Sequence, residues 1–250
     1  MAKKNSKNTE RREMVAQMRA EQARKERNRS LLILGVCVVV VLGLLSAALV
    51  PYIKHQRDIN RLKHTQIQNL GVKASDAACD SIVTRAPTGL DKSGAKGNHV
   101  NIGDDIKYAY NPPAFGQHWP NFLATSEYRT FYTAADRPDL HRMVHSLEHG
   151  HTLIWYDDTV KSGSADYKAL QDIAKKYDGT TTYVNVVPWT STDNGGGKFP
   201  AGKHIAITHW SDKNNDQEGR WQYCGKVSGA VIKDFVNAYP STDSPEAGAP

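Results

Sequence analysis

The chain has 250 residues, three cysteines and a formal net charge of +6, and its length allows one large or two small domains. The basic charge is concentrated in residues 1–30, which contain ten Lys or Arg and four Glu, so the rest of the chain has no net charge. A protein that binds nucleic acid would carry basic charge on its folded part. The distribution therefore argues against a nucleic-acid partner.

Residues 31–50 form a stretch of twenty residues without a charged side chain. As a helix that rises about 1.5 Å per residue, this stretch would be roughly 30 Å long, which matches the hydrocarbon core of a bilayer. The alternative is a cleavable signal peptide, but its apolar core usually has only about 7–15 residues. The sequence therefore predicts a signal anchor with a single transmembrane helix over residues 31–53.

Basic residues flank this span on both sides, but ten precede it and only four follow it closely. By the positive-inside rule, residues 1–30 are predicted to be a basic cytoplasmic tail of a single-pass plasma-membrane protein. The rest of the chain would lie outside the cytoplasm. It is predicted to contain a helical stalk or linker (54–76), a folded domain (77–240) and a tail that is disordered by composition (241–250).

The cysteines agree with this topology. Cys37 lies within the predicted span, which leaves Cys79 and Cys224 as one pair near the two ends of the domain. Outside the cytoplasm, such a pair is expected to form a disulfide. Two separate buried thiols are the alternative interpretation.

Within the domain, strand-like and helix-like segments alternate and predict a compact α+β fold with a mixed sheet and flanking helices. Residues 111–122, NPPAFGQHWPNF, contain paired prolines that exclude helix and sheet, while their aromatic residues favour an ordered loop. The remaining expected elements are strands at 99–110, 152–156, 181–188 and 204–210 and helices from 140 to the glycine at 150, at 165–177 and at 227–239.

The segment 140–157, LHRMVHSLEHGHTLIWYD, contains four of the ten histidines around one carboxylate, Glu148. Three of these histidines are four residues apart, so in a helix they would lie along one face over two turns. Gly150 is a residue type that commonly ends a helix. The histidines are His141, His145, His149 and His151.

Three interpretations of this segment remain open. Two histidines four apart on a helix can bind one transition-metal ion, and a distant loop can supply a third ligand. Here the set would be His118, His145 and His149, with Zn or Cu as the ion.

In the second interpretation, residues 145–149 fit the H-x-x-E-H pattern of zinc hydrolases, in which Glu148 would activate a metal-bound water. In the third, the side chains are structural, and Glu148 hydrogen-bonds to His118 and fixes the proline loop onto the helix. No serine or cysteine nucleophile arrangement stands out, and the sequence favours a non-enzymatic role.

The segments NPPAFGQHW and HSLEHGHTLIWY resemble an actinobacterial family of single-span membrane proteins of unknown function. The resemblance covers roughly residues 79–239, and its motifs are an Asn-Pro-Pro loop with a Gly and a His, then a His-Ser-Leu-Glu-His-Gly core, commonly with two flanking cysteines. The chain departs from the family at Ala114 and Phe115, where many members have a small hydroxyl residue. The matching motif positions are Asn111, Pro112, Pro113, Gly116, His118, His145, Ser146, Leu147, Glu148, His149 and Gly150.

Some members of this family look like accessory subunits on the outer face of the actinobacterial cytochrome bc and cytochrome aa respiratory supercomplex. The resemblance therefore implies an extracytoplasmic accessory or interaction protein, with respiratory membrane-complex subunits as partners. A metal-binding protein is the alternative function.

Overall fold

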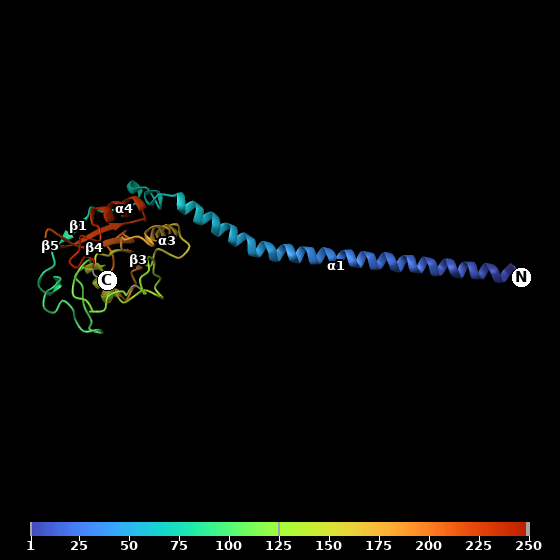
Figure 1. The fold of residues 1–250 in the computed structure, drawn as a ribbon, viewed down its shortest axis with the longest axis horizontal. Coiled ribbons are helices and arrows are strands. Elements are labelled where there is room, and N and C mark those ends of the chain that lie inside the picture. The colour runs from blue at the N-terminus through green and yellow to red at the C-terminus, as the bar shows by residue number, and fades with distance from the viewer. Residues whose placement is uncertain (1, 125, 249–250) are drawn as a thin grey trace. The chain divides into compact units, whose positions relative to one another are not determined.

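The structure, a computed structural model, describes residues 2–124 and 126–248. The chain divides into two compact units after Lys63 (Figure 1). The first unit consists of the helix α1 (Ala2–His64) up to Lys63, with Pro51 inside it. In the part of the chain that the structure describes, the segment Glu10–His64 of α1 is the one helix long and apolar enough to cross a membrane. The protein thus has a candidate single membrane span near its N-terminus.

The second unit is an α+β domain built on a five-stranded mixed sheet, as the sequence predicts. The strand order is β1-β5-β4-β2-β3, with β2 and β3 parallel and the other neighbours antiparallel. The strands are β1 (Val83–Arg85), β2 (Thr152–Tyr156), β3 (Val184–Pro188), β4 (Ile205–Lys213) and β5 (Asp216–Cys224). The helices are α2 (Leu140–Glu148), α3 (Ala165–Tyr177) and α4 (Gly229–Ala238).

Helices cover both faces of the sheet. The helices α3 and α4 lie on one side of it (Figure 1), while α2 and the proline loop pack on the other side. The core on the α2 side contains Leu147 of α2, Phe115 of the loop and the fully buried Trp155 and Trp210 of the central strands. The tryptophans are thus mainly core residues.

The expected strand at 99–110 is wrong. Apart from an isolated bridge between His99 and His118, these residues form turns and loops. Gly103 adopts φ +97°, a left-handed conformation that a regular strand does not contain. The carbonyl of Asn98 and the amide of Val100 instead bond to the backbone of His118, so this segment pairs with the proline loop.

The strand β5 is missing from the sequence-based prediction. It forms a hairpin with β4 through Asn214 and Asn215, which have φ of 62° and 60°. Asparagine tolerates this conformation, and a two-residue turn of this kind matches the twist of a hairpin. Only some positions of β5 are buried, which explains its weak hydrophobic signal.

The described part of the tail that is expected to be disordered makes contacts with the domain. The backbone carbonyl of Asp243 accepts a hydrogen bond from His209, and its carboxylate accepts one from Ser211. The amide of Glu246 donates to the carbonyl of Glu148 at 3.0 Å. These contacts place the described part of the segment against β4 and the end of α2 although its composition is polar.

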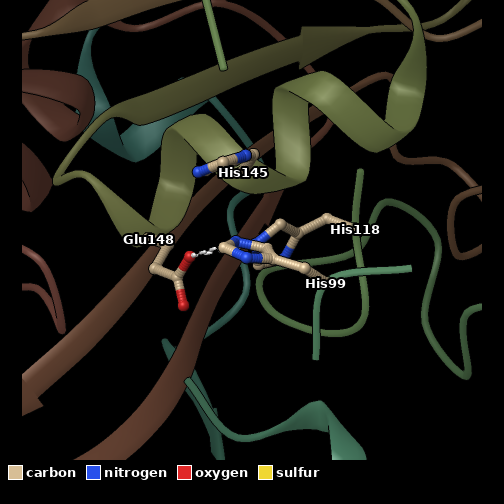
Figure 2. Close-up of side chains that lie close together, drawn as sticks. All are labelled: His99, His118, His145 and Glu148. Atoms are coloured by element: carbon tan, nitrogen blue, oxygen red, sulfur yellow. Dashed lines mark ion pairs between the residues drawn. The ribbon is translucent and has the colours of Figure 1, made fainter. Parts of the chain in front are cut away.

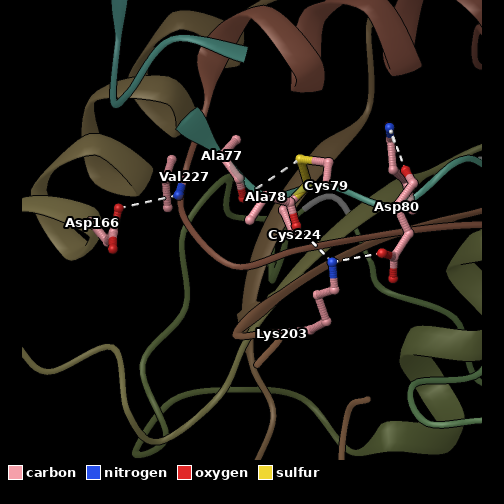
Figure 3. Close-up of a disulfide and its surroundings, with 9 residues drawn as sticks. Ala77, Ala78, Cys79, Asp80, Asp166, Lys203, Cys224 and Val227 are labelled. Atoms are coloured by element: carbon pink, nitrogen blue, oxygen red, sulfur yellow. Dashed lines mark hydrogen bonds and ion pairs between the residues drawn. A yellow bond between two sulfur atoms is a disulfide. The ribbon is translucent and has the colours of Figure 1, made fainter. Parts of the chain in front are cut away.

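Cys79 and Cys224 form a disulfide that links the end of β5 to the start of the domain, across 145 residues (Figure 3). Hydrogen bonds surround the link. The amide of Gly225 donates to the carbonyl of Ala77 at 2.9 Å, and Lys203 contacts both the carbonyl of Ala78 and the carboxylate of Asp80 at 2.6 Å. A disulfide is typical of an extracytoplasmic domain.

Candidate metal centre

The helix α2 presents the first part of the site. Its N-terminus is capped by the Asp139 carboxylate, which accepts a hydrogen bond from the amide of His141. The helix ends before Gly150, whose φ is +89°, and a Cβ at this position would lie 2.1 Å from the carbonyl oxygen of Ser241. Glycine is therefore required here both for the backbone conformation and for the close approach of the C-terminal segment.

The proline loop supplies the second part. Two side chains of β5 hold it: the Trp221 indole donates to the carbonyl of Pro112 at 2.8 Å, and the Tyr223 hydroxyl donates to the carbonyl of Asn111 at 2.9 Å. The loop is ordered, as its aromatic residues predict. Its far end carries His118 to α2 and, through the backbone pairing described above, brings His99 to the same place.

Four side chains from these three segments converge in one cluster: His99, His118, His145 and Glu148 (Figure 2). One potential ligand atom from each lies within 4.8 Å of the others, and three of the four residues are buried. The Nε2 atom of His118 is 2.9 Å from Oε2 of Glu148, and Nε2 of His99 is 3.7 Å from the same oxygen. We call these four residues the central cluster.

The backbone fixes the tautomers of two of these histidines. Nδ1 of His118 lies 2.8 Å from the carbonyl oxygen of Gly116, and Nδ1 of His145 lies 2.7 Å from that of Trp119. Because a carbonyl oxygen can only accept, each Nδ1 carries the hydrogen. In the neutral rings, Nε2 then presents its lone pair to the cluster, and metal-ligating histidines commonly have such an outer hydrogen bond.

The contact between His118 and Glu148 leaves two buried atoms without a hydrogen bond. Neither Nε2 of His118 nor Oε2 of Glu148 has a hydrogen-bond partner of acceptable geometry among the described residues, although both side chains are at most 1% exposed. The other carboxylate oxygen accepts a hydrogen bond from the Asn98 amide at 3.1 Å. Buried polar atoms are normally paired, so two adjacent unpaired ones need an explanation.

The protonation states suit a metal ion. Burial raises the pKa of the Glu148 carboxyl, but the hydrogen bond and the charge that a protonated His118 supplies outweigh this effect, and the pKa is about 2. A metal ion bound at Nε2 of His118 would supply the same positive charge in place of that proton. Burial, and then the neighbouring His118, lowers the pKa of His145 to about 3. At neutral pH Glu148 is therefore a carboxylate and His145 is a neutral imidazole, which are the forms that bind metals.

The other histidines of the segment point elsewhere. His141 stacks on Trp119 at a ring distance of 4.8 Å, and its Nδ1 contacts Asp139. Since a helix turns about 100° per residue, positions eight apart differ by roughly 80° and do not share a direction. Nε2 of His149 lies 3.1 Å from Nε2 of His145 and 3.5 Å from the Glu246 carboxylate.

Of the predicted ligand set, the structure thus brings His118 and His145 into the central cluster, whereas His149 belongs to a neighbouring group with Glu148 and Glu246. Sequence reasoning missed His99 as a ligand candidate, because nothing in its local sequence distinguishes it. Its position depends on the pairing of residues 98–100 with the proline loop, which no local pattern shows.

The fold and the cluster define a class: an α+β domain with a buried histidine and carboxylate centre, preceded by a candidate membrane span. The family model described as a protein of unknown function, DUF3105, matches residues 99–250, and the chain belongs to this family. A model described as an inhibitor of host cell division protein domain matches residues 9–65, a region that is almost entirely α1. No curated protein and no solved structure matches the chain.

Proposed function

We propose that the protein is a membrane-anchored accessory protein whose extracytoplasmic domain binds a transition-metal ion, Zn²⁺ or Cu²⁺. The ligands are the members of the central cluster, His99, His118, His145 and Glu148. The observation that carries this proposal is the buried pair of Nε2 of His118 and Oε2 of Glu148, two lone-pair atoms 2.9 Å apart without hydrogen-bond partners among the described residues. A cation between them removes their repulsion and gives each atom a partner.

The chemistry of the donors supports Zn²⁺ or Cu²⁺. Imidazole nitrogen is a usual ligand of both ions, and a carboxylate completes many such sites. Ca²⁺ and Mg²⁺ prefer oxygen ligands, and this cluster offers carboxylate oxygen from one residue only. Three imidazoles with one carboxylate therefore favour a transition metal.

A zinc hydrolase is the less favoured function. In that mechanism Glu148 would have to reach a metal-bound water and a substrate. Instead it is 1% exposed, and its oxygens face Asn98 and His118 inside the domain. A carboxylate in this position suits a ligand better than a general base.

The orientation in the membrane is part of the proposal. We place residues 1–30 in the cytoplasm and the α+β domain outside it, because the basic tail precedes the candidate span and the Cys79–Cys224 disulfide suits an oxidising compartment. A reporter that is active only outside the cytoplasm should be active when fused to the C-terminus. Activity only of a cytoplasmic reporter at that position would contradict this orientation.

Metal analysis of the full chain tests the proposed function. Protein purified in detergent without chelator should contain at least one equivalent of Zn or Cu, and His118→Ala should lose one equivalent. His141→Ala is the matched control, because His141 lies on the same helix but outside the cluster. Metal-free wild type that takes up neither ion on titration would overturn the proposal.

A place beside the cytochrome bc–aa respiratory supercomplex is a second proposal, supported by the resemblance of the proline loop and the HSLEHG core. The full chain solubilised in a mild detergent should then travel with respiratory subunits. Purification of the wild type without any respiratory subunit would contradict this role and leave the metal proposal untouched.

A further inference from the structure

The second group of potential ligands lies directly beside the central cluster. It consists of Glu148, His149 and Glu246, with one potential ligand atom from each within 4.8 Å of the others. Glu148 belongs to both groups. The segment that carries Glu246 is fixed to the end of α2, because its backbone amide donates to the carbonyl of Glu148 at 3.0 Å.

The two carboxylates of this group lie close together. Two carboxylate oxygens, one from Glu148 and one from Glu246, lie within 4.8 Å of each other. Among the described residues, no Lys or Arg forms an ion pair with either carboxylate, and their ionic contacts are with histidines. Since like charges repel at this distance, a cation between the two carboxylates would stabilise the arrangement.

The Glu148 carboxylate has the capacity to serve two ions. A carboxylate offers about four lone-pair sites on its two oxygens, and Asn98 occupies one of them. Its Oε2 atom is buried and has no hydrogen-bond partner among the described residues. One shared carboxylate between neighbouring ions is compatible with the ion separation of about 3.5–4 Å in two-metal sites.

The histidines are divided between the two positions. Nε2 of His145 and Nε2 of His149 face each other at 3.1 Å. Because Nδ1 of His145 donates to Trp119, a neutral His145 can only accept in this contact, and His149 donates to it. When each Nε2 binds its own ion, this hydrogen bond is replaced by two metal bonds, one on each side of Glu148.

We propose that Glu148, His149 and Glu246 form a second metal position, which shares the Glu148 carboxylate with the ion of the central cluster. The inference rests on the proposed function, because Glu148 is a ligand of both ions. The second position is the more accessible one, since the Glu246 side chain is 45% exposed. It should therefore bind its ion more weakly and lose it first to a chelator.

Zn²⁺ titration of metal-free full-length protein tests the number of positions. The wild type should bind two equivalents, Glu246→Ala should bind one, and Glu148→Ala should bind neither tightly. Glu218→Ala is the matched control at a partly exposed glutamate outside both groups, and it should bind two. Because Glu246 is half-exposed, its removal should leave the fold intact, which near-unchanged melting of the metal-free variant would verify.

Cu²⁺ resonance spectra test whether the two ions are neighbours. Two Cu²⁺ ions that share a carboxylate couple magnetically, so the doubly loaded wild type should give a reduced signal, while Glu246→Ala should give the full signal of an isolated ion.

The titration distinguishes the two proposals. Binding of one equivalent of Zn²⁺ by both the wild type and Glu246→Ala would overturn the second position and leave the proposed function standing. No uptake at all would overturn both, and uptake lost in Glu246→Ala but kept in His118→Ala would overturn the central site alone.

Discussion

His118 and His209 are equally buried, each with a fully inaccessible side chain. They differ in whether the surrounding groups give both ring nitrogens a hydrogen-bond partner. The Nε2 of His209 lies 2.7 Å from the carbonyl oxygen of Asp243, and its Nδ1 lies 3.2 Å from both the Thr152 hydroxyl and the carbonyl oxygen of His151. With the hydrogen on Nε2, the ring donates to Asp243 and accepts from Thr152. A neutral imidazole has one donor and one acceptor, so His209 is satisfied as it stands. His118 uses its donor on Gly116 and then faces a carboxylate with its lone pair.

This difference separates a histidine that is part of the architecture from one that is placed to bind. Burial alone does not distinguish them, and neither does position in a histidine-rich segment, because His151 belongs to that segment but donates from Nδ1 to the Asn185 side chain at 2.7 Å. What distinguishes them is whether the neighbours complete the neutral ring. The predictions that follow test this contrast, beginning with the largest effect.

Replacement of both disulfide cysteines, Cys79→Ser with Cys224→Ser, should lower the free energy of unfolding by about 5 kcal/mol, because the link closes a loop of 145 residues in the unfolded chain. The bond touches neither His118 nor His209, so the loss should be the same with and without metal. Denaturant unfolding in both conditions measures it. A loss that depends on metal would show that the disulfide is coupled to the central cluster. The difference between His118 and His209 would then depend on more than their immediate contacts.

Metal should stabilise the protein through His118 and not through His209. At a Zn²⁺ concentration about 1,000 times the dissociation constant, binding to the folded state adds about 4 kcal/mol to the stability of the wild type. His118→Ala should lose the part of this gain that comes from the central cluster. His209→Gln should be destabilised in the absence of metal but should keep the gain, because His209 lies outside the cluster. Thermal melts with Zn²⁺ and with chelator measure this gain. If the melting temperature of the wild type is the same in both, His118 does not bind the ion and does not differ from His209 in this respect.

The sequence predicts the part of this fold that depends on local pattern. The spacing of apolar residues predicts α3, and the β-branched and aromatic run after Gly150 predicts β2. The strand β5 is not predictable in this way, because its partial burial leaves few apolar positions and its pairing with β4 is set by a turn of two asparagines.

The candidate site divides in the same way. The i, i+4 spacing predicts that His145 and His149 approach each other, and their Nε2 atoms are 3.1 Å apart. The contribution of His99 depends on loop pairing over long range, and that of Glu246 depends on the packing of a polar tail onto α2. Neither contact leaves a periodic signal in the sequence, so both require the tertiary structure.

Acid should weaken the domain through its satisfied histidines. Burial lowers the pKa of His151 to about 4 and also lowers the pKa of His209. The unfolded chain therefore binds more protons than the folded chain between about pH 6.5 and pH 4, and stability falls as the pH falls through this window. For His151 the loss between pH 6.5 and pH 5 should be about 2 kcal/mol.

Unfolding in chelator at pH 7 and pH 5 measures this loss. The variant His151→Gln cannot take up the proton and should lose less stability between these pH values than the wild type. The Glu148 carboxyl, with a pKa of about 2, should not contribute to this loss, because it is ionised in both the folded and the unfolded chain above its unfolded pKa of about 4.3. An equal loss in wild type and His151→Gln would show that His151 is not the group that titrates.

The smallest effect should come from Glu148→Gln in the absence of metal. The glutamine amide can donate to Nε2 of His118, and its oxygen can still accept from Asn98, so two facing acceptors become a donor and an acceptor. In chelator this variant should therefore be within about 1 kcal/mol of the wild type, while Glu148→Ala should lose about 2 kcal/mol because it leaves buried partners unpaired. With Zn²⁺ the two proteins should differ more, because Glu148→Gln should lack the stabilisation that the wild type gains. The substitution would make His118 resemble His209, a neutral ring with both nitrogens satisfied. A loss of several kcal/mol for Glu148→Gln in chelator would instead show that His118 is a cation paired with the carboxylate, and the central cluster would then be architecture.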